Sequence, residues 1–562
     1  MKQKNFFLLL IIIVGSLVHI GFFSINEILK NADSFAYLQM SYYFKQLNLS
    51  GFGTGWFGFL YSFFISIFGI ITFFINEYYS ALLLNIILFG SSAYILYKIG
   101  EIYLEKKYNL LLIILYYLSP ILLSFNITIL SENIYILIFL GFILFLLKSF
   151  NNPDKNRNIK FFITISIFLA LLYFTRAEAF IYIGSVFILL FFYELRNHKF
   201  KIINNKIWIN IIKKSSLIIL FFLIFISPYI FYLHSITGEW GLTNKGSANL
   251  RQAELRGTDK MDDEGFEKAV GELTNDNHNL KSGFVGGLTY NLGEKSESLK
   301  EYLLKNPKET TFRILENQLK LYLKNIPELI VGDSMKLFYS KDSIFYKNYI
   351  FILVCTLPLL LVLYGLYKMF KQKEYDFLII FFSFFSVASI FFTLFFVLNR
   401  YFLFFLPLIL IILVFGLQNI KVKYKETLIS LLIGLYLLGN YTFYNSVKND
   451  DYKYQVKKIA GEWLKENKDI TNSRIMERFP IVTYYSGTKE RWLTPFTDDL
   501  NNLIEYAKYN NINYFVVDSL DFKTYRPNLI FLLSDDFKNN SLIKLKTFKI
   551  NNEKVILYKF NF

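Results

Sequence analysis

The stretch FFLLLIIIVGSLVHIGFF, residues 6–23, is a nearly continuous apolar run, and such a run crosses a bilayer when it reaches about 20 residues. It follows a basic start, MKQK, yet it is too long for the apolar part of a secretory signal, and no small-x-small cleavage site follows it. We therefore expect a retained anchor helix whose amino-terminal end lies in the cytoplasm.

Blocks of the same kind recur along the 562 residues, of which 54% are hydrophobic, and the mean hydropathy is +0.37. A soluble domain scatters its apolar residues periodically, whereas here they are grouped in bilayer-length blocks. The sequence therefore predicts an all-α polytopic membrane protein. Its richness in Ile, Leu, Phe, Lys and Asn is typical of an AT-rich bacterial genome, so we expect a bacterial cytoplasmic (inner) membrane.

The formal net charge of +16 comes from Lys and Arg residues that cluster in short segments between the apolar blocks. This placement favours positive-inside topology and attraction to anionic lipid over nucleic-acid binding, so no nucleic-acid partner is expected. The lone Cys355 lies inside an apolar block, which excludes a disulfide framework and a thiolate metal site.

The basic segments also predict the topology. They all fall on the cytoplasmic side only if the apolar block from Trp56 to about Phe74 is embedded without crossing. The chain then has about eleven spans. The expected parts are a membrane domain over residues 1–445, with a first external loop at 25–56 and a large external loop at 236–345, and an extracytoplasmic domain over residues 446–562.

Ionisable residues in the short turns between apolar blocks converge on the outer face. A charge inside an apolar span costs about 2.5 to 3.5 kcal/mol on insertion scales, so its usual meaning is function or pairing. Plainer explanations exist, because acids cap helices, an arginine and an acid in one turn pair with each other, and arginines anchor the membrane interface. The residues are Asp33, Glu132, Arg176, Glu178 and Arg400.

Taken together, these residues predict a pocket at the outer membrane surface. Arginine binds phosphate through bidentate, charge-assisted hydrogen bonds, and a carboxylate nearby can take a proton from a hydroxyl group. A lipid-linked phosphosugar and a hydroxyl acceptor would fit such a pocket.

Five short stretches carry a resemblance to known enzymes. Their order is similar to that of the polytopic glycosyltransferases with the C fold, in particular the bacterial relatives of protein mannosyltransferases and the aminoarabinose transferases. The likeness runs from about residue 5 to about residue 420. The stretches are D-x-x-x-Y at Asp33 and Tyr37, SPILLSFNITILSEN with Glu132, YFTRAEA with Arg176, SPYIFYLHSITGEWGLTNKG with Lys245, and NRYFLFFLP with Arg400 and Tyr401.

The resemblance implies an inverting transfer of a sugar from a polyprenyl-phosphate donor to a hydroxyl group of a lipid, a glycan or a protein. Inversion needs a base on the face opposite the leaving group, and the resemblance implies Asp33 for that base and Glu132 as a second catalytic acid. It also implies that the donor phosphate is bound by Arg176, Lys245 and Arg400 and that the pocket is lined by Tyr37, Glu178 and Tyr401.

Three departures from the family pattern concern the acceptor and the metal. Asp33 is flanked by Ala32 and Ser34, where many relatives carry paired acids, and GTGWFGFLY stands where a Pro-rich segment is expected before Tyr61. Ala177 also stands where the family often has proline. The first loop contains no D-x-D motif and the chain has only 4 His, so no metal or other cofactor is expected.

The large loop contains Phe312, Leu315, Leu319 and Leu323 at helical spacing, which predicts a helix lying on the membrane surface. A lid over the acceptor site and a structural connector are both open interpretations of this loop.

The composition changes after the last span, near Leu438. VKKIAGEWLKEN and LNNLIEYAKYN have helical periodicity, INYFVVDS reads as a strand, and LIKLKTFKINNEKVILYKF reads as a hairpin turning at Asn551 and Asn552. These patterns predict a small α/β domain that recognises the acceptor or a partner. Asp518, Tyr484 and Tyr485 are more typical of structural positions than of a second active site.

The main alternative function is a polytopic transporter or flippase for a lipid-linked or polysaccharide substrate. Such proteins tend to show internal repeats and binding charges near the bilayer midplane, whereas this sequence has no clear repeat and its charges gather at one surface. A sensor or scaffold would not explain why Asp33, Glu132, Arg176 and Arg400 share that surface.

Overall fold

Helices dominate the chain, because a segment in a bilayer must satisfy its own backbone hydrogen bonds. The computed structural model describes all residues except 1, 26–28, 30, 54, 151–157, 198–204, 239, 244–306, 333–348, 396, 422–424, 468–469, 471–472, 489, 493, 495–498 and 525. The chain divides into two units, the first made of residues 1–25, 72–235 and 311–445 and the second of residues 26–71, 236–310 and 446–562.

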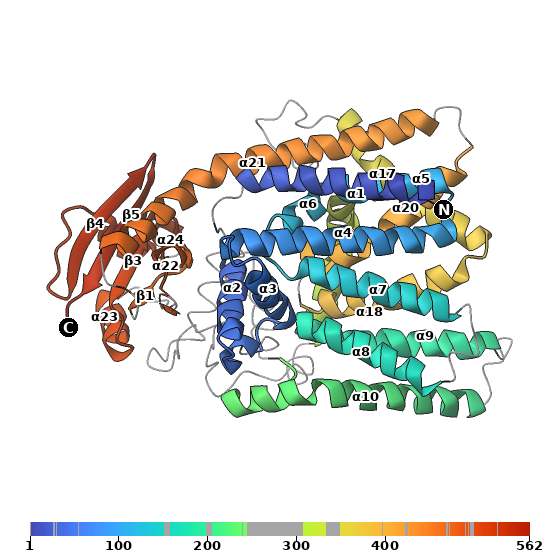
Figure 1. Cartoon of the computed structure of the whole chain (residues 1–562), viewed down its shortest axis with the longest axis horizontal. Coiled ribbons are helices and arrows are strands. Elements are labelled where there is room, and N and C mark those ends of the chain that lie inside the picture. The colour runs from blue at the N-terminus through green and yellow to red at the C-terminus, as the bar shows by residue number, and fades with distance from the viewer. Residues whose placement is uncertain are drawn as a thin grey trace. The chain divides into compact units, whose positions relative to one another are not determined.

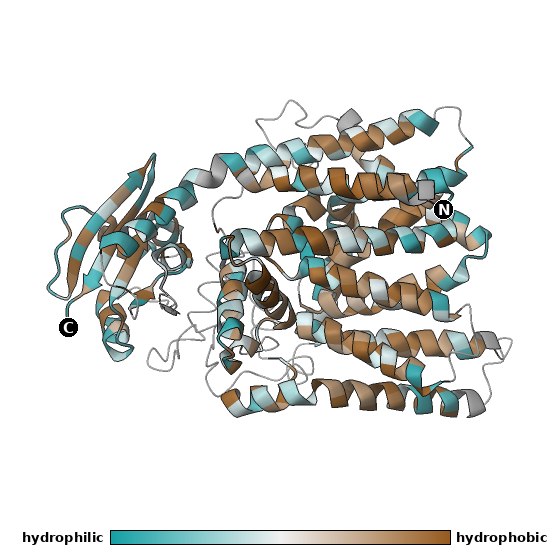
Figure 2. Cartoon of the chain, viewed as in Figure 1, coloured by the Kyte–Doolittle hydropathy of each residue, from teal (hydrophilic) through white to brown (hydrophobic). Residues whose placement is uncertain are grey.

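The helices of the first unit run roughly side by side (Figure 1) and carry hydrophobic residues over most of their surface (Figure 2). The helices that belong to it or reach into it are α1 (Lys2–Gly21), α4 (Glu77–Tyr103), α5 (Lys106–Leu118), α6 (Pro120–Asn126), α7 (Glu132–Phe150), α8 (Ile159–Thr175), α9 (Tyr182–Asn197), α10 (Asn205–Thr237), α14 (Pro307–Lys320), α15 (Ile326–Val331), α17 (Tyr349–Lys371), α18 (Tyr375–Thr393), α19 (Asn399–Phe402), α20 (Leu406–Asn419) and α21 (Lys425–Asn467).

The lengths of these helices confirm a multi-pass membrane protein. Among the described residues, seven helices are long and apolar enough to cross a membrane, and the pair α5 and α6, bent by 57°, gives an eighth crossing if it is one span. The other predicted spans fall on α1, α8 and α17. The total of about eleven stays a prediction.

The span Asn399–Asn419, which contains α19 and α20, is the most enclosed of these helices, with 94% of its most apolar stretch buried. Helix α17 touches its backbone, since a Cβ added to Gly365 would stand 2.0 Å from the carbonyl oxygen of Ile412. Lipid tails give helices no hydrophobic reason to pair, so close packing through small residues holds them together. Arg400, near the start of this span, is therefore carried by a firmly packed element.

The block that was expected not to cross the membrane forms helix α3 (Leu60–Ile71), which belongs to the second unit with α2 (Ala32–Lys45) and the turn η2 (Leu49–Phe52). At about 1.5 Å per residue α3 is about 18 Å long, well short of the roughly 30 Å of a hydrocarbon core. Tyr61 of α3 packs edge-on against Tyr37 of α2, with ring centres 5.1 Å apart. The length of α3 agrees with a block that does not cross by itself.

The carboxyl-terminal residues form a sheet with helices packed on both faces, in the strand order β2-β1-β3-β5-β4. Strands β2, β1 and β3 are parallel, and β5 and β4 are antiparallel. Val516 packs with α21, and Phe515 and Val517 pack with the helices of the other face. The elements are β1 (Arg474–Met476), α22 (Ile481–Ser486), β2 (Glu490–Trp492), α23 (Leu500–Tyr509), β3 (Tyr514–Asp518), α24 (Ser519–Thr524), η8 (Pro527–Leu533), β4 (Leu542–Ile550) and β5 (Glu553–Phe560).

This arrangement confirms the predicted α/β domain and the predicted hairpin of β4 and β5. The turn falls on Asn551 and Asn552, and Asn551 takes a positive φ of 54°, a conformation that asparagine tolerates better than most residues. Asp518 forms an ion pair with Lys457 at 2.9 Å, and both side chains are 2% exposed. A buried ion pair of this kind supports a structural role for Asp518 over a role in a second active site.

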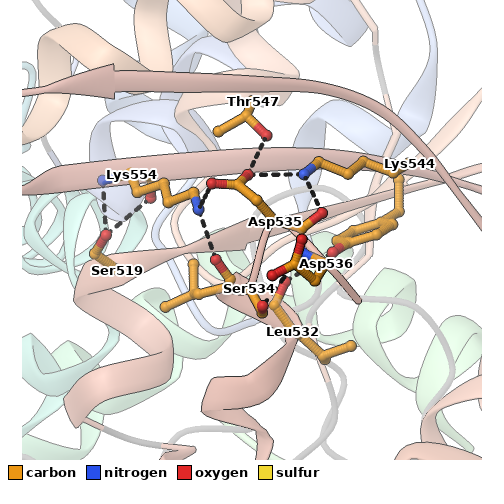
Figure 3. A network of polar contacts seen from close by, with 10 residues as sticks. Ser519, Leu532, Ser534, Asp535, Asp536, Lys544, Thr547 and Lys554 are labelled. Carbon is orange, nitrogen blue, oxygen red and sulfur yellow. Dashed lines mark hydrogen bonds and ion pairs between the residues drawn. The ribbon is translucent and has the colours of Figure 1, made fainter. Parts of the chain in front are cut away.

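A network of polar contacts ties the hairpin to the segment after η8 (Figure 3). The carboxylate of Asp535 accepts hydrogen bonds from Nζ of Lys544 and Nζ of Lys554, each at 2.8 Å. Lys554 Nζ also donates to the carbonyl oxygen of Leu533 at 2.8 Å, and its backbone N–H donates to Ser519 Oγ at 2.7 Å. The two lysines hold the pKa of the Asp535 carboxyl below its usual range. Because the Asp535 side chain is 63% exposed, water screens these contacts, which orient the hairpin more than they stabilise it.

Gly461 of α21 gives a test of the packing in this domain. An added Cβ would lie 2.7 Å from the carbonyl oxygen of Val482 in α22, so Gly461→Ala should force the two helices apart at a cost of about 1 to 3 kcal/mol. We expect amide hydrogens of α22 and β1 to exchange about 5 to 150 times faster in the full-length variant. Hydrogen exchange followed by mass spectrometry measures this change.

Gly434→Ala is the matched control, because Gly434 lies on the same helix and an added Cβ meets no atom within 4 Å. It should leave the exchange unchanged or slow it, since alanine favours helix over glycine by up to about 1 kcal/mol. Equal exchange in both variants would contradict the close approach at Gly461.

Candidate active site

Three charged side chains from distant parts of the chain meet in the first unit. Glu132 is the first residue of α7, Arg176 follows the last residue of α8 and precedes the 3-10 turn η4 (Ala177–Ile181), and Arg400 belongs to α19. Each residue lies at the end of an apolar helix. The cluster therefore lies at the level of the membrane surface and not at the bilayer midplane.

Glu132 binds both arginines through one oxygen atom. Its Oε1 accepts hydrogen bonds from Nη1 of Arg176 at 3.0 Å and from Nε of Arg400 at 3.0 Å, and Nη2 of Arg400 lies 2.9 Å away. The Glu132 side chain is only 3% exposed, so the two guanidinium groups offset a desolvation cost that an unpaired carboxylate would carry. Its second oxygen, Oε2, is buried and has no hydrogen-bond partner in the part of the chain that the structure describes.

Arg176 is held on all sides. Glu178 Oε1 accepts hydrogen bonds from its Nε at 3.1 Å and its Nη2 at 2.9 Å. Its guanidinium carbon lies 5.5 Å from the ring centre of Tyr401 and 6.0 Å from that of Tyr135, within the range of cation–π attraction. The Arg176 side chain is 10% exposed and the Arg400 side chain 27%. Arg400 is therefore the more accessible of the two cations.

The segment that leads to Glu132 is irregular, and a side-chain amide satisfies its backbone. Helices α5 and α6 meet at the 57° bend, and residues 127–131 connect α6 to α7. Nδ2 of Asn85 on α4 donates to the carbonyl oxygens of Asn126 at 3.3 Å and Thr128 at 2.8 Å. Since an unsatisfied backbone group in a bilayer costs several kcal/mol, Asn85 stabilises the break and the turn that places Glu132.

Buried His19 of α1 supports the same break from the other side. Its Nε2 donates to the carbonyl oxygen of Tyr117 at 3.0 Å, because a carbonyl can only accept, and its Nδ1 then accepts from Nδ2 of Asn126 at 2.7 Å. Nδ2 of Asn440 on α21 donates to the carbonyl oxygen of Leu118 at 2.9 Å. Side chains from several helices thus fix the broken segment.

The structure brings together five of the predicted site residues. Arg176 does pair with Glu178, as the plainer explanation held, but it also reaches Glu132, and Arg400 binds Glu132 instead of serving only as an interface anchor. The five are Glu132, Arg176, Glu178, Arg400 and Tyr401. Their catalytic or binding roles stay predictions.

The other predicted site residues are outside these contacts. Asp33 and Tyr37 are on α2 in the second unit. Asn31 is the N-cap of α2 and accepts from the backbone N–H of Asp33 at 2.8 Å, so Asp33 lies in the first turn, half-buried, and is not the capping residue. Lys245 falls outside the described residues.

Sequence reasoning missed Tyr135, Asn85, Asn126 and His19. A signal was present, because a polar side chain inside an apolar block, such as Asn85 in ALLLNIILF, is costly unless it is paired. Tyr135 follows Glu132 by three residues on a helix and so shares its face. The partners of these side chains could not be read from the sequence, since most are backbone carbonyls freed by a bend.

Comparison with known proteins gives no match to a family model and no match among curated sequences. Solved structures of the oligosaccharyltransferase AglB from Archaeoglobus fulgidus do match over most of the chain. The complex with an inhibitory peptide and a dolichol-phosphate is 12% identical with a TM-score of 0.51, covering 94% of this chain and 72% of that chain. The apo form is 13% identical with a TM-score of 0.52, covering 93% and 70%. The form tethered to an acceptor peptide containing the NVT sequon is 12% identical with a TM-score of 0.51, covering 92% and 70%.

The chain has the GT-C fold of membrane glycosyltransferases. At this identity the likeness shows the fold and not the family, so the expected kinship with the protein mannosyltransferases and aminoarabinose transferases stays a prediction.

A further structure of the Archaeoglobus fulgidus oligosaccharyltransferase was solved in complex with Zn and sulfate. Within the described residues of this chain, no group of three or more His, Cys, Asp or Glu side chains could hold a metal ion. The acids of the charged cluster are both engaged by arginines.

The shared oxygen of Glu132 gives a second test. Glu132→Gln keeps the shape but removes the charge that offsets two guanidinium groups, so it should destabilise the protein by about 3 kcal/mol or more. Glu178→Gln is the matched control. The Glu178 side chain is 20% exposed, and this substitution leaves Arg176 paired with Glu132. Thermal unfolding in lipid nanodiscs measures both, and an equal loss in the two variants would contradict the central place of Glu132.

The Asn85 contacts can be tested separately. Asn85→Leu fills a similar volume but leaves two buried carbonyl oxygens without their donor, at a cost of about 1 to 3 kcal/mol. Ser91→Ala, on the same helix, removes only an exposed hydroxyl that bonds to its own helix and should change little. We expect a lower unfolding temperature for Asn85→Leu alone, and unaltered unfolding would show that the broken segment does not depend on this amide.

Proposed function

We propose that the protein is a membrane glycosyltransferase that moves a sugar from a polyprenyl-phosphate donor to an acceptor hydroxyl at the outer face of the bacterial cytoplasmic membrane. The observation that carries this proposal is the buried Glu132 that binds Arg176 and Arg400 at the membrane-surface end of a GT-C fold. A phosphate attached to a lipid must sit at this level, with its chain in the bilayer.

The two arginines would serve the donor in different ways. Arg176 already bridges two carboxylates and is nearly buried, so its part is to hold the cluster in shape. Arg400 is the more exposed cation, and it would bind the donor phosphate and stabilise the negative charge that grows on the leaving oxygen. Lys245 is a further candidate for phosphate binding.

Asp33 would act as the general base, as the resemblance implies. Its carboxylate takes the proton of the acceptor hydroxyl while that oxygen attacks the anomeric carbon from the face opposite the phosphate. The bond between the anomeric carbon and the phosphate oxygen breaks, and polyprenyl phosphate leaves. The products are a sugar of inverted configuration on the acceptor, the lipid phosphate and a protonated Asp33, which returns its proton to solvent.

The ligands of the neighbours support this choice of substrates. The archaeal oligosaccharyltransferase was solved with a dolichol-phosphate, and in another structure with an acceptor peptide. A lipid phosphate therefore suits the donor side of this chain, and a peptide suits the protein among the three expected acceptor classes.

The transporter alternative has one feature in its favour, the break between α5 and α6, since discontinuous helices often bind ions in transporters. Here, however, carbonyl oxygens at the break already accept hydrogen bonds from His19, Asn85 and Asn440. The break is thus satisfied by the protein itself, which favours a structural role.

Two substitutions test the proposal. Asp33→Asn should abolish sugar transfer, by about a hundredfold or more, while the protein still inserts and binds donor, because only the base is lost. Arg400→Ala should weaken donor binding. Transfer is measured by mass spectrometry of glycolipids, glycans and glycoproteins from cells that lack the protein and carry either variant or the wild type.

Full activity of Asp33→Asn would refute the role of this carboxylate, and Glu132 would be tested next. Unchanged sugar structures with precursors retained on the cytoplasmic side would instead indicate a transporter.

A further inference from the structure

Helix α14 displays a row of large apolar side chains on its surface. The exposed fractions are 71% for Phe312, 59% for Leu315 and 61% for Leu319, and Leu323, in the π-helical turn that follows, is 75% exposed. Their spacing of three or four residues places them on one face. A row of this kind is costly in water, so it needs an apolar partner.

The opposite face of α14 is bound to the end of a membrane span. Asn317 Nδ2 donates to the carbonyl oxygens of Thr393 at 3.0 Å and Phe395 at 3.3 Å. Gln318 Nε2 donates to Thr393 Oγ1 at 3.1 Å, and its Oε1 accepts from Ser389 Oγ at 3.1 Å. Thr393 is the last residue of α18, whose 19 residues extend over about 28 Å, close to the thickness of a hydrocarbon core. Helix α14 is therefore held where the hydrocarbon ends.

Charged residues flank the apolar row along one side, and Lys308, four residues before Phe312, lies on the face of the row itself at the start of α14. At 100° per residue, Glu316 and Lys320 follow the row in the same angular direction, and they form an ion pair at 2.6 Å. Arg313 lies farther round in the same direction. The helix thus has a protein-bound face, an apolar face and a charged edge between them.

We infer that α14 is an interfacial helix whose partner is the lipid surface itself. Phe312, Leu315 and Leu319 enter the boundary between headgroups and acyl chains, and the charged edge faces water and headgroups. The adjoining span α18 already requires a bilayer at this level. The bilayer offers a continuous apolar surface for the exposed row of α14. This inference does not depend on the proposed function.

Hydrogen bonds connect α14 and the segment after it to the residues just before Arg400. After α14 the chain passes through the π-helical turn Leu321–Asn325 into α15. Asn325 Nδ2, at the end of that turn, donates to Asn399 Oδ1 at 2.7 Å, and Asn399 Nδ2 donates to Oε2 of Glu328 in α15 at 3.1 Å. The segment 393–399 is thus bound at both ends by the α14–α15 arm, and Arg400 follows it directly.

Site-directed spin labelling tests the lipid contact. The chain has a single cysteine, the buried Cys355, so Cys355→Ala gives a background for Leu319→Cys and Lys320→Cys, two exposed neighbours on α14. The full-length protein is placed in nanodiscs of phosphatidylethanolamine and phosphatidylglycerol. We expect the label at 319 to collide more with oxygen, which concentrates in lipid, and the label at 320 to collide more with a water-soluble nickel chelate.

Two results would overturn the inference. Equal access of the nickel chelate to both labels would place the apolar row in water. A label at 319 that is shielded from oxygen and nickel alike would show that protein covers the row, and dilution of labelled with unlabelled chains would then separate a second copy from residues 244–306 of the same chain.

Discussion

The contact of Glu132 with Arg176 and Arg400 is the constraint on which the rest of the first unit depends. A carboxylate that is almost fully buried must be matched by positive charge, and here the match comes from two helices far away in the sequence. The ends of α7, α8 and the enclosed span Asn399–Asn419 must therefore meet at one point. With Glu178 as the second acid, the charges balance inside the cluster, and any phosphate that bound to Arg400 would have to compete with the Glu132 carboxylate for it.

The broken helix pair α5 and α6 shows how this meeting point is built. A bend frees carbonyl oxygens, and a bilayer supplies no water to satisfy them. Asn85, His19 and Asn440 supply the missing donors from three other helices. Side chains of other helices thus bond to the bend and to the start of the turn before Glu132, so packed neighbours help to place this acid.

The membrane class, the expected charged turns and the carboxyl-terminal hairpin could be predicted from the sequence because each rests on a local rule. Bilayer thickness sets the length of apolar blocks, and Asn551 with Asn552 sets the turn. The contacts of Glu132 could not be predicted in detail, since sharing one oxygen depends on distances between remote helices. Strands β1 and β2 have three residues each, too few for a pattern, so the strand order was also beyond reach.

Strand β4 lies at one end of the described sheet, with one side of its backbone unpaired by the strand order. Such an edge is a template for adding a strand of another molecule. This strand carries three lysines, Lys544, Lys546 and Lys549. Its register with β5 shifts between Lys544 and Lys546. Repulsion between like charges and an uneven rim make self-polymerisation unfavourable. Edge-to-edge pairing between copies of this domain is therefore disfavoured.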